Sequence, residues 1–253
     1  MFENLKYVKF SSSSDNQQLA FDDSSSIVFY SNLLKLNVTV NSINDCILLL
    51  DDHFKQLHTF YVTISSSNYG LSSEENNKKL INLKYFSFTQ KLNLLCCNEV
   101  LIPLLQRMSN LEELCLNFVN SYGPIIDSGN LKENILNHMR KLNKFTFNIR
   151  SINALTELGH LPLDKDIQST FWNFKNKEII SYIDYFEKSA LFNYHIYSYP
   201  YRWTCYDNIT NNFPGGIFRC VREISLYDEH PFEHVIFSPN CSIISIHRKM
   251  TSK

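Results

Sequence analysis

Long apolar stretches and runs of basic residues are both missing from this sequence. No segment approaches the roughly 18 consecutive apolar residues of a membrane-spanning helix. Lysine and arginine together number 24 against 25 aspartate and glutamate, a net charge of −1, whereas nucleic-acid-binding surfaces are strongly basic. The opening segment MFENLKYVKF is too charged for a secretory signal. We therefore predict neither a nucleic-acid partner nor a membrane partner.

The cysteines are few, odd in number and irregularly spaced. There are seven, none of them in a C-x-x-C pair, and most lie inside apolar runs. Cysteines of this kind are usually small buried hydrophobic residues in a reducing compartment. The pattern favours a cytoplasmic or nuclear protein.

Catalytic motifs are also scarce. The chain has no glycine-rich phosphate loop of the G-x-G-x-x-G or G-x-x-x-x-G-K-[ST] type and no G-x-S-x-G nucleophile turn. We predict a protein that is not an enzyme, with no catalytic residue, no cofactor and no metal.

One segment, HPFEH, leaves a different interpretation open. His230, Glu233 and His234 match the H-x-x-E-H pattern of some zinc hydrolases, in which two histidines one helical turn apart hold the metal. A third ligand would have to come from further along the chain, and only 19 residues follow His234. The other interpretation is the start of a surface helix. A metal-dependent hydrolase therefore stays as an alternative function.

A short apolar pattern, Leu-x-x-[apolar]-x-[apolar] after a polar residue, occurs six times in residues 1–150. The copies read NLKYVKF, NLLKLNV, QLHTFYV, NLKYFSF, NLEELCL and KLNKFTF. Their leading residues, Leu5, Leu33, Leu57, Leu83, Leu111 and Leu142, are 28, 24, 26, 28 and 31 positions apart. This spacing is close to the ~20–29 residues of leucine-rich repeats, and it predicts neighbouring parallel strands.

Three segments between the copies have helical periodicity: INDCILLLDDHFK, NEVLIPLLQRM and SGNLKENILNHM. Helices alternating with strands predict an α/β fold. We expect an irregular leucine-rich-repeat-like solenoid, with parallel strands on one face and helices on the other. The asparagine that usually follows the repeat motif is present only as Asn41. The alternative is an ordinary α/β domain with evenly spaced elements.

The regular spacing ends after residue 150, so residues 151–253 are predicted as a second region. ISYIDYF and FNYHIYSYPYRWTCY alternate apolar and polar residues and predict an antiparallel pair of strands. We expect residues 151–220 to form a hairpin insertion packed on the solenoid of residues 1–150. CVREISL and CSIISI then predict one or two final repeat units.

The residues between the apolar positions of each copy should point away from the core, because side chains alternate along a strand. Lined up, they would form a polar, aromatic concave face suited to binding a protein. The predicted protein-binding residues are Lys35, Asn37, Thr59, Tyr61, Tyr85, Ser87, Glu113, Cys115, Lys144 and Thr146.

Several blocks, in order, give the chain a family resemblance. They are MSNLEELCLNFV, HMRKLNKFTFNI, DIQ-x-x-F, SYIDYF, HIYSYPY, NNFPGGIFRCVREISL and HPFEH. Over roughly residues 80–240 the chain resembles F-box proteins with leucine-rich-repeat-like C-terminal regions. The resemblance implies the substrate-recognition region of a cullin-type ubiquitin ligase, with a protein target as partner.

In that family an F-box before the repeats binds a Skp-type adaptor, but no F-box precedes the first copy here. We expect the adaptor to bind only if an F-box lies upstream. The first copy also lacks a polar cap, so we expect something upstream to cover it. A truncated, non-functional fragment is a further alternative.

Overall fold

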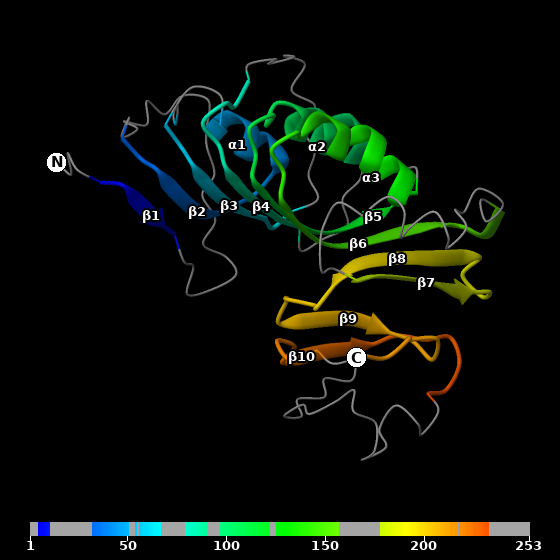
Figure 1. Ribbon diagram of the computed structural model, residues 1–253. Helices are drawn as coiled ribbons and strands as arrows, with labels where there is room; N and C mark the ends of the chain where they lie inside the picture. The colour runs from blue at the N-terminus through cyan, green and yellow to red at the C-terminus, as the bar shows by residue number, and fades with distance from the viewer. Residues whose placement is uncertain are drawn as a thin grey trace.

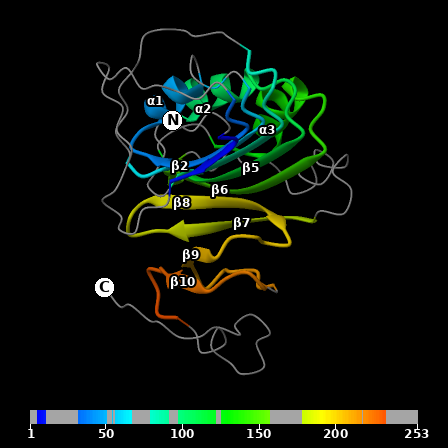
Figure 2. The ribbon, with the colours of Figure 1, turned by 90° about the vertical axis from the view of Figure 1, so that its left-hand side faces the viewer.

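The computed structural model describes residues 5–10, 32–50, 54, 56–66, 79–90, 97–121, 125–156, 178–216 and 218–232. A twisted eight-stranded sheet forms the centre of the molecule (Figure 1). Three helices lie on one side of this sheet, and a second, two-stranded sheet lies on the other side (Figure 2). Within the described residues, no helix has the length and apolar character needed to cross a bilayer.

The large sheet has the order β1-β2-β3-β4-β5-β6-β8-β7. Six parallel strands follow one another in chain order: β1 (Tyr7–Lys9), β2 (Lys35–Val40), β3 (Thr59–Ile64), β4 (Tyr85–Gln90), β5 (Glu113–Ser121) and β6 (Lys144–Ala154). The last two strands, β7 (Glu178–Phe186) and β8 (Leu191–Tyr199), pair antiparallel, and β8 pairs antiparallel with β6.

The register confirms that the six copies lie side by side. Phe60 of β3 pairs with Leu36 on one side and with Phe86 on the other. Phe86 pairs in turn with Leu114, and Leu114 with Phe145. Equivalent positions of successive copies are therefore direct neighbours in the sheet.

A repeated backbone contact fixes this register at the start of each strand. The carbonyl of His58, directly after the motif residue Leu57, accepts the amides of Lys84 and Tyr85 at 2.9 and 3.0 Å. The carbonyls of Lys6, Leu34, Lys84 and Glu112 each accept two amides from the next strand in the same way. The bonds do not depend on side-chain identity, which explains how copies of different sequence pair in one register.

The three predicted helical segments correspond to α1 (Ile43–Leu48), to α2 (Cys97–Gln106), which begins one residue before the predicted segment, and to α3 (Ser128–Asn134) followed by the short helix η2 (Leu136–His138). Ser42 begins α1 with a capping box, because its hydroxyl accepts the Asp45 amide while the Asp45 carboxylate accepts the Ser42 amide. The Asp127 carboxylate caps α3 by accepting the Asn130 amide at 2.7 Å.

The apolar stripes of the helices and the apolar strand positions form one core. Phe60, Phe86 and Phe147 are completely buried in it, together with Cys46 of α1 and Leu105 of α2. No isolated copy could bury its apolar side chains, because each copy needs the strands beside it. The core therefore depends on contacts between segments about two dozen residues apart.

The predicted fold class, a leucine-rich-repeat-like solenoid with helices on one face, is wrong. The protein has a mixed α/β fold built on one large, mostly parallel sheet. A solenoid stacks similar units from one end to the other. In the part of the chain that the structure describes, three α-helices accompany the eight strands of this sheet, and the sheet ends in an antiparallel pair.

The second half also differs from the prediction in its placement. The antiparallel pair of strands exists, but it continues the plane of the large sheet instead of forming an insertion packed on a solenoid. The expected repeat unit at CVREISL is β10 (Glu223–Leu226), which pairs with β9 (Cys205–Ile209) in the separate small sheet. The other expected unit, CSIISI, lies outside the described residues.

Candidate functional site: the polar face of the large sheet

The two faces of the parallel strands differ in burial. In β2, β3 and β4, buried residues alternate strictly with half-buried ones. The buried residues, such as Leu36 and Phe86, belong to the core under the helices. The half-buried residues point to the opposite side. We call this side, from β1 to β5 with Lys144 and Thr146 of β6, the polar face.

The structure brings all the predicted protein-binding residues together on the polar face. One row across the strands contains Lys35, Thr59, Tyr85, Glu113 and Lys144, and the next contains Asn37, Tyr61, Ser87, Cys115 and Thr146. Tyr7 and Lys9 extend these rows onto β1. Thr146 is the exception in burial, since only 5% of it is exposed.

On the first four strands of this face, one ammonium group and several aromatic rings contact each other. The Lys35 ammonium lies between two rings, 5.1 Å from the centroid of Tyr7 and 5.2 Å from that of Tyr61. The Tyr61 and Tyr85 rings are 4.7 Å apart. Partial burial is the main cause that raises the pKa of Tyr85 above its ordinary value, so its hydroxyl stays protonated. These contacts hold the side chains in place before any partner binds.

The charges at the other end of the polar face neutralise each other. The Lys144 ammonium donates to the Glu113 carboxylate at 2.5 Å. The two residues are direct cross-strand partners on β5 and β6. Cys115 is half-buried on the same strand as Glu113 and forms no disulfide.

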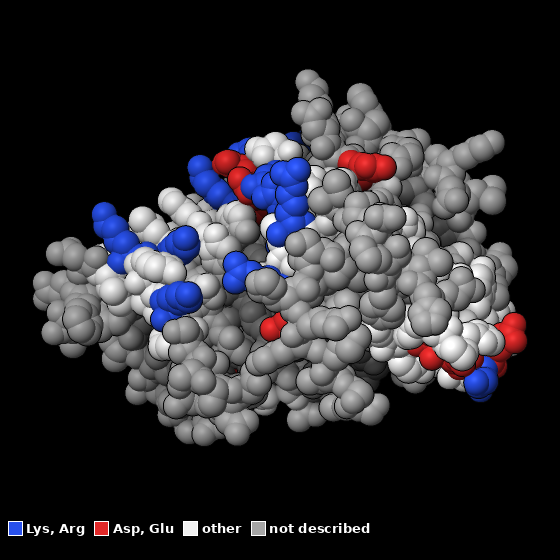
Figure 3. Space-filling model, turned by 90° about the horizontal axis from the view of Figure 1, so that it is seen from below, with Lys and Arg blue, Asp and Glu red and all other residues white. Residues whose placement is uncertain are grey.

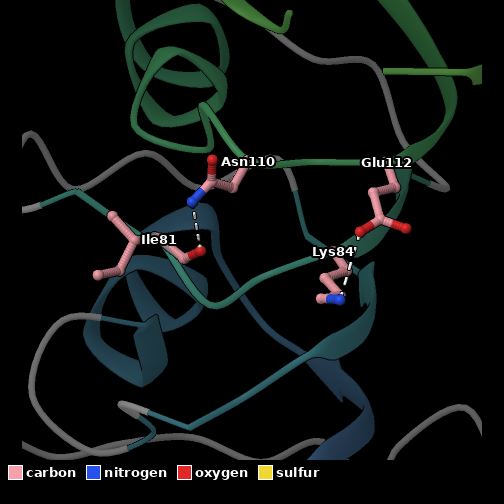
Figure 4. Close-up of polar contacts among 4 residues, drawn as sticks. All are labelled: Ile81, Lys84, Asn110 and Glu112. Carbon is pink, nitrogen blue, oxygen red and sulfur yellow. Dashed lines mark hydrogen bonds and ion pairs between the residues drawn. The ribbon is translucent and has the colours of Figure 1, made fainter. Parts of the chain in front are cut away.

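Side chains also link the chain segments that lead into β4 and β5 (Figure 4). The Asn110 amide donates to the Ile81 carbonyl at 2.9 Å, and the Lys84 ammonium is 3.3 Å from the Glu112 carboxylate. Asn110 is the polar residue that precedes the motif residue Leu111. The hydrogen bond of Asn110 to Ile81 therefore links the copy that begins at Leu111 to the copy that begins at Leu83.

The small sheet forms the boundary of the polar face beyond β5. Tyr201, in the turn before β9, lies against the face because its hydroxyl accepts a hydrogen bond from Asn148 of β6 at 3.1 Å. The Trp203 ring packs on Tyr201 with the ring centroids 5.2 Å apart. The side chains of Tyr201, Tyr206 and Ile209 form a second apolar core with residues of β8 and β7.

A buried polar network joins the small sheet to the large one. His195 of β8, which is fully buried, has its Nε2 2.6 Å from Asn148 Oδ1 and its Nδ1 3.0 Å from the Tyr182 hydroxyl. The Tyr182 hydroxyl is 2.9 Å from that of Tyr206 on β9. Asn148 also donates to Asn117 Oδ1 at 2.8 Å, which connects the network to the polar face.

Burial decides the protonation state of this network. It holds the pKa of His195 well below the ordinary value, with a smaller contribution from the nearby Arg150 charge. Because the amide oxygen of Asn148 can only accept, the neutral imidazole carries its proton on Nε2, and Nδ1 accepts from the Tyr182 hydroxyl. Burial also raises the pKa of Tyr182 to about 12.

Two further charged groups lie at the same interface. Arg150 of β6 donates to the backbone carbonyl of Asp207 on β9. Asp184 of β7 accepts a hydrogen bond from the Thr210 hydroxyl, and burial raises the pKa of its carboxyl to about 6. These contacts attach the small sheet to the large one.

Sequence reasoning did not identify His195, Asp184 or Arg150 as members of a network. For His195 and Asp184, the only signal was the presence of polar side chains at alternating positions of two predicted strands, SYIDYF and HIYSYPY. Alternation of this kind normally indicates a solvent-facing side. Here that side is covered by the small sheet, which comes from a later part of the chain.

The candidate metal segment is only partly described. His230 is exposed and donates its backbone amide to Asp228, whereas Glu233 and His234 lie outside the described residues. Among the residues that are described, no group of three histidine, cysteine or acidic side chains could hold a metal ion. No observation in the structure favours the metal-dependent alternative.

Comparison with known proteins does not assign a family. No protein-family model matches the chain, and neither the curated proteins nor the solved structures include a significant match.

Proposed function

We propose that this protein is an interaction module that binds a partner protein through the polar face. The observation that supports the proposal is the ordered, half-exposed group formed by Lys35, Tyr61 and Tyr85 on neighbouring strands. Tyrosine contributes a large apolar ring and a hydroxyl, and it is enriched among the residues that dominate binding energy. Side chains that are already held in place lose less conformational entropy when a partner binds.

The sheet beneath these side chains also suits binding. Continuous parallel pairing from β1 to β6 holds the rows in one register. The row formed by Thr39, Thr63 and Thr89 adds hydroxyl groups that can donate or accept hydrogen bonds. The polar face thus combines apolar rings with many small polar groups, as protein interfaces do.

We further propose ubiquitin ligation as the setting of this binding, in which case the partner would be the target of the ligase. Support for this setting comes from the resemblance of residues 80–240 to F-box proteins. Co-purification of a Skp-type adaptor with the protein from its own cells would agree with the setting. Failure to recover the adaptor would remove it and leave the binding proposal in place.

The binding proposal can be tested by comparing retained proteins in a quantitative pull-down. We expect at least one protein to be retained by the wild-type chain and lost from the double variant Tyr61→Ala/Tyr85→Ala. It should still be retained by Lys132→Gln, because Lys132 lies on α3 on the opposite side of the sheet. The protein identified in this way is then purified and its affinity for the three forms measured directly.

Circular dichroism and thermal unfolding must show that the double variant is folded. If no protein is retained differently by the wild-type chain and the folded double variant, the polar face is not the binding surface and the proposal is wrong.

A further inference from the structure

The charges on the polar face are unevenly distributed. The strands β1 to β4 read YVK, KLNVTV, TFYVTI and YFSFTQ, and none contains an aspartate or a glutamate. Their charged residues are Lys9 and Lys35, and both side chains are on the polar face. The first acidic residue of the face is Glu113 on β5, and Lys144 neutralises it.

Figure 3 views the molecule from the side of the polar face and shows several lysine or arginine side chains in its left-hand part, where β1 and β2 lie. Lys9 pairs in register with Asn37, two positions beyond Lys35 on the adjacent strand. The two ammonium groups thus come from neighbouring strands and from adjacent rows. A carboxylate placed between them would be close to both.

The tyrosine rings beside Lys35 position its ammonium group but do not neutralise it. An ammonium held over the faces of Tyr7 and Tyr61 is positioned without being neutralised, because the rings carry no net charge. Its positive charge is therefore still available to a carboxylate. Tyr7, which is 48% exposed, and the paired rings of Tyr61 and Tyr85 provide apolar contact next to that charge.

We infer that the surface formed by Tyr7, Lys9, Lys35, Tyr61 and Tyr85 binds an acidic segment of the partner protein. Carboxylates of that segment pair with the two lysines, and its apolar side chains pack on the tyrosine rings. The inference rests on the proposed function and specifies the chemistry of the partner. Charge complementarity supports it, because like charges across an interface disfavour binding whereas opposite charges favour encounter and alignment.

The inference can be tested with two fluorescein-labelled peptides and the full chain. One peptide alternates glutamate with leucine, and the other has glutamine in place of every glutamate. Fluorescence anisotropy measures their affinities at ~0.05 and ~0.15 M salt, where screening differs. We expect the glutamate peptide to bind, to bind more weakly at the higher salt, and to bind much more tightly than the glutamine peptide.

Charge-removing variants test the named lysines. The double variant Lys9→Gln/Lys35→Gln should weaken binding of the glutamate peptide about tenfold, the effect expected for the loss of two partly exposed ion pairs. Lys132→Gln removes the same kind of charge from α3, on the helical side, and should leave the affinity unchanged. Thermal unfolding confirms that the variants are folded.

Three outcomes would overturn the inference. The first is equal binding of both peptides, and the second is no binding of either. The third is that the protein binds a single-stranded oligonucleotide but not the glutamate peptide, and that the lysine double variant loses the binding of the oligonucleotide. None of them contradicts the proposed function, which the tyrosine double variant decides separately in the pull-down.

Discussion

The imidazole of His195 and the amide of Asn148 form a hydrogen bond between β8 and β6 of the large sheet, within the network that extends to Tyr206 of the small sheet. Their Nε2 and Oδ1 atoms are 2.6 Å apart, and the two residues are 47 positions apart in the chain. Asn148 uses its amide nitrogen for Asn117 and Tyr201. A single side chain thus joins the buried network, the edge of the polar face and the turn that leads into the small sheet.

Replacing His195 by alanine should destabilise the protein by about 2–4 kcal/mol. The substitution leaves a cavity and removes a buried hydrogen-bond partner from both Asn148 and Tyr182. Urea unfolding followed by circular dichroism measures the loss. The control is His58→Ala, because His58 has an exposed side chain, and its effect should stay within about 0.5 kcal/mol. Equal losses in the two variants would contradict the structural role of the network.

The Asp184 carboxyl should make stability depend on pH in an unusual direction. Burial raises its pKa from 3.8 to about 6, so the folded state holds this proton more tightly than the unfolded state does. Stability contributed by the protonated carboxyl is therefore present below about pH 4 and is lost as the pH rises to about 6. His195 has the opposite effect, because its lowered pKa makes the unfolded state bind the additional proton below about pH 6.5.

The Asp184→Asn variant separates these two effects. Asparagine can still accept the hydrogen bond from Thr210 but cannot ionise. Between pH 4 and pH 6 the variant should gain stability relative to the wild-type protein, by on the order of 2 kcal/mol. Urea unfolding at a series of pH values gives this difference. A difference that stays constant with pH would show that the Asp184 carboxyl is not perturbed in the folded protein.

Neighbouring residues of β4 should differ sharply in their effect on stability because they lie on opposite faces. Phe86 is completely buried in the core, and Phe86→Ala should cost about 3–5 kcal/mol. Tyr85 is on the polar face and contacts Tyr61, so Tyr85→Ala should cost only about 1 kcal/mol. Thermal unfolding of the two variants under one set of conditions makes the comparison. A loss for Tyr85→Ala as large as that for Phe86→Ala would contradict the assignment of the two faces.

The strands and helices that the structure describes between residues 5 and 156 could be predicted because their signals are local. Leu57, Phe60 and Val62 mark one strand by alternation, and the same pattern returns near Leu83 and Leu111. Strands that share a pattern bury their apolar side chains best when equivalent positions are neighbours, which is the pairing of Phe60 with Phe86. The members of the candidate binding surface follow directly from that register.

The predicted fold class is wrong because the apolar pattern of a strand does not determine the sheet to which the strand belongs. The segment CVREISL has the same apolar spacing as the six copies, yet Ile224 pairs with Tyr206 in the small sheet. A strand pattern states which side chains are buried together but does not state which strand is the partner. The hairpin of β7 and β8 likewise extends the large sheet, because β8 pairs antiparallel with the edge of β6.

The sequence by itself determined the secondary structure of most of the described segments and the two faces of each parallel strand, because side-chain alternation and helical periodicity are properties of short stretches. Only the tertiary structure decided where the polar face ends and why His195, Asp184 and Arg150 are buried. Their burial requires the small sheet, whose strand β9 comes from a later part of the chain and lies over β6, β7 and β8. Contacts between segments so far apart in sequence depend on the packing of the whole molecule, and no local pattern records them.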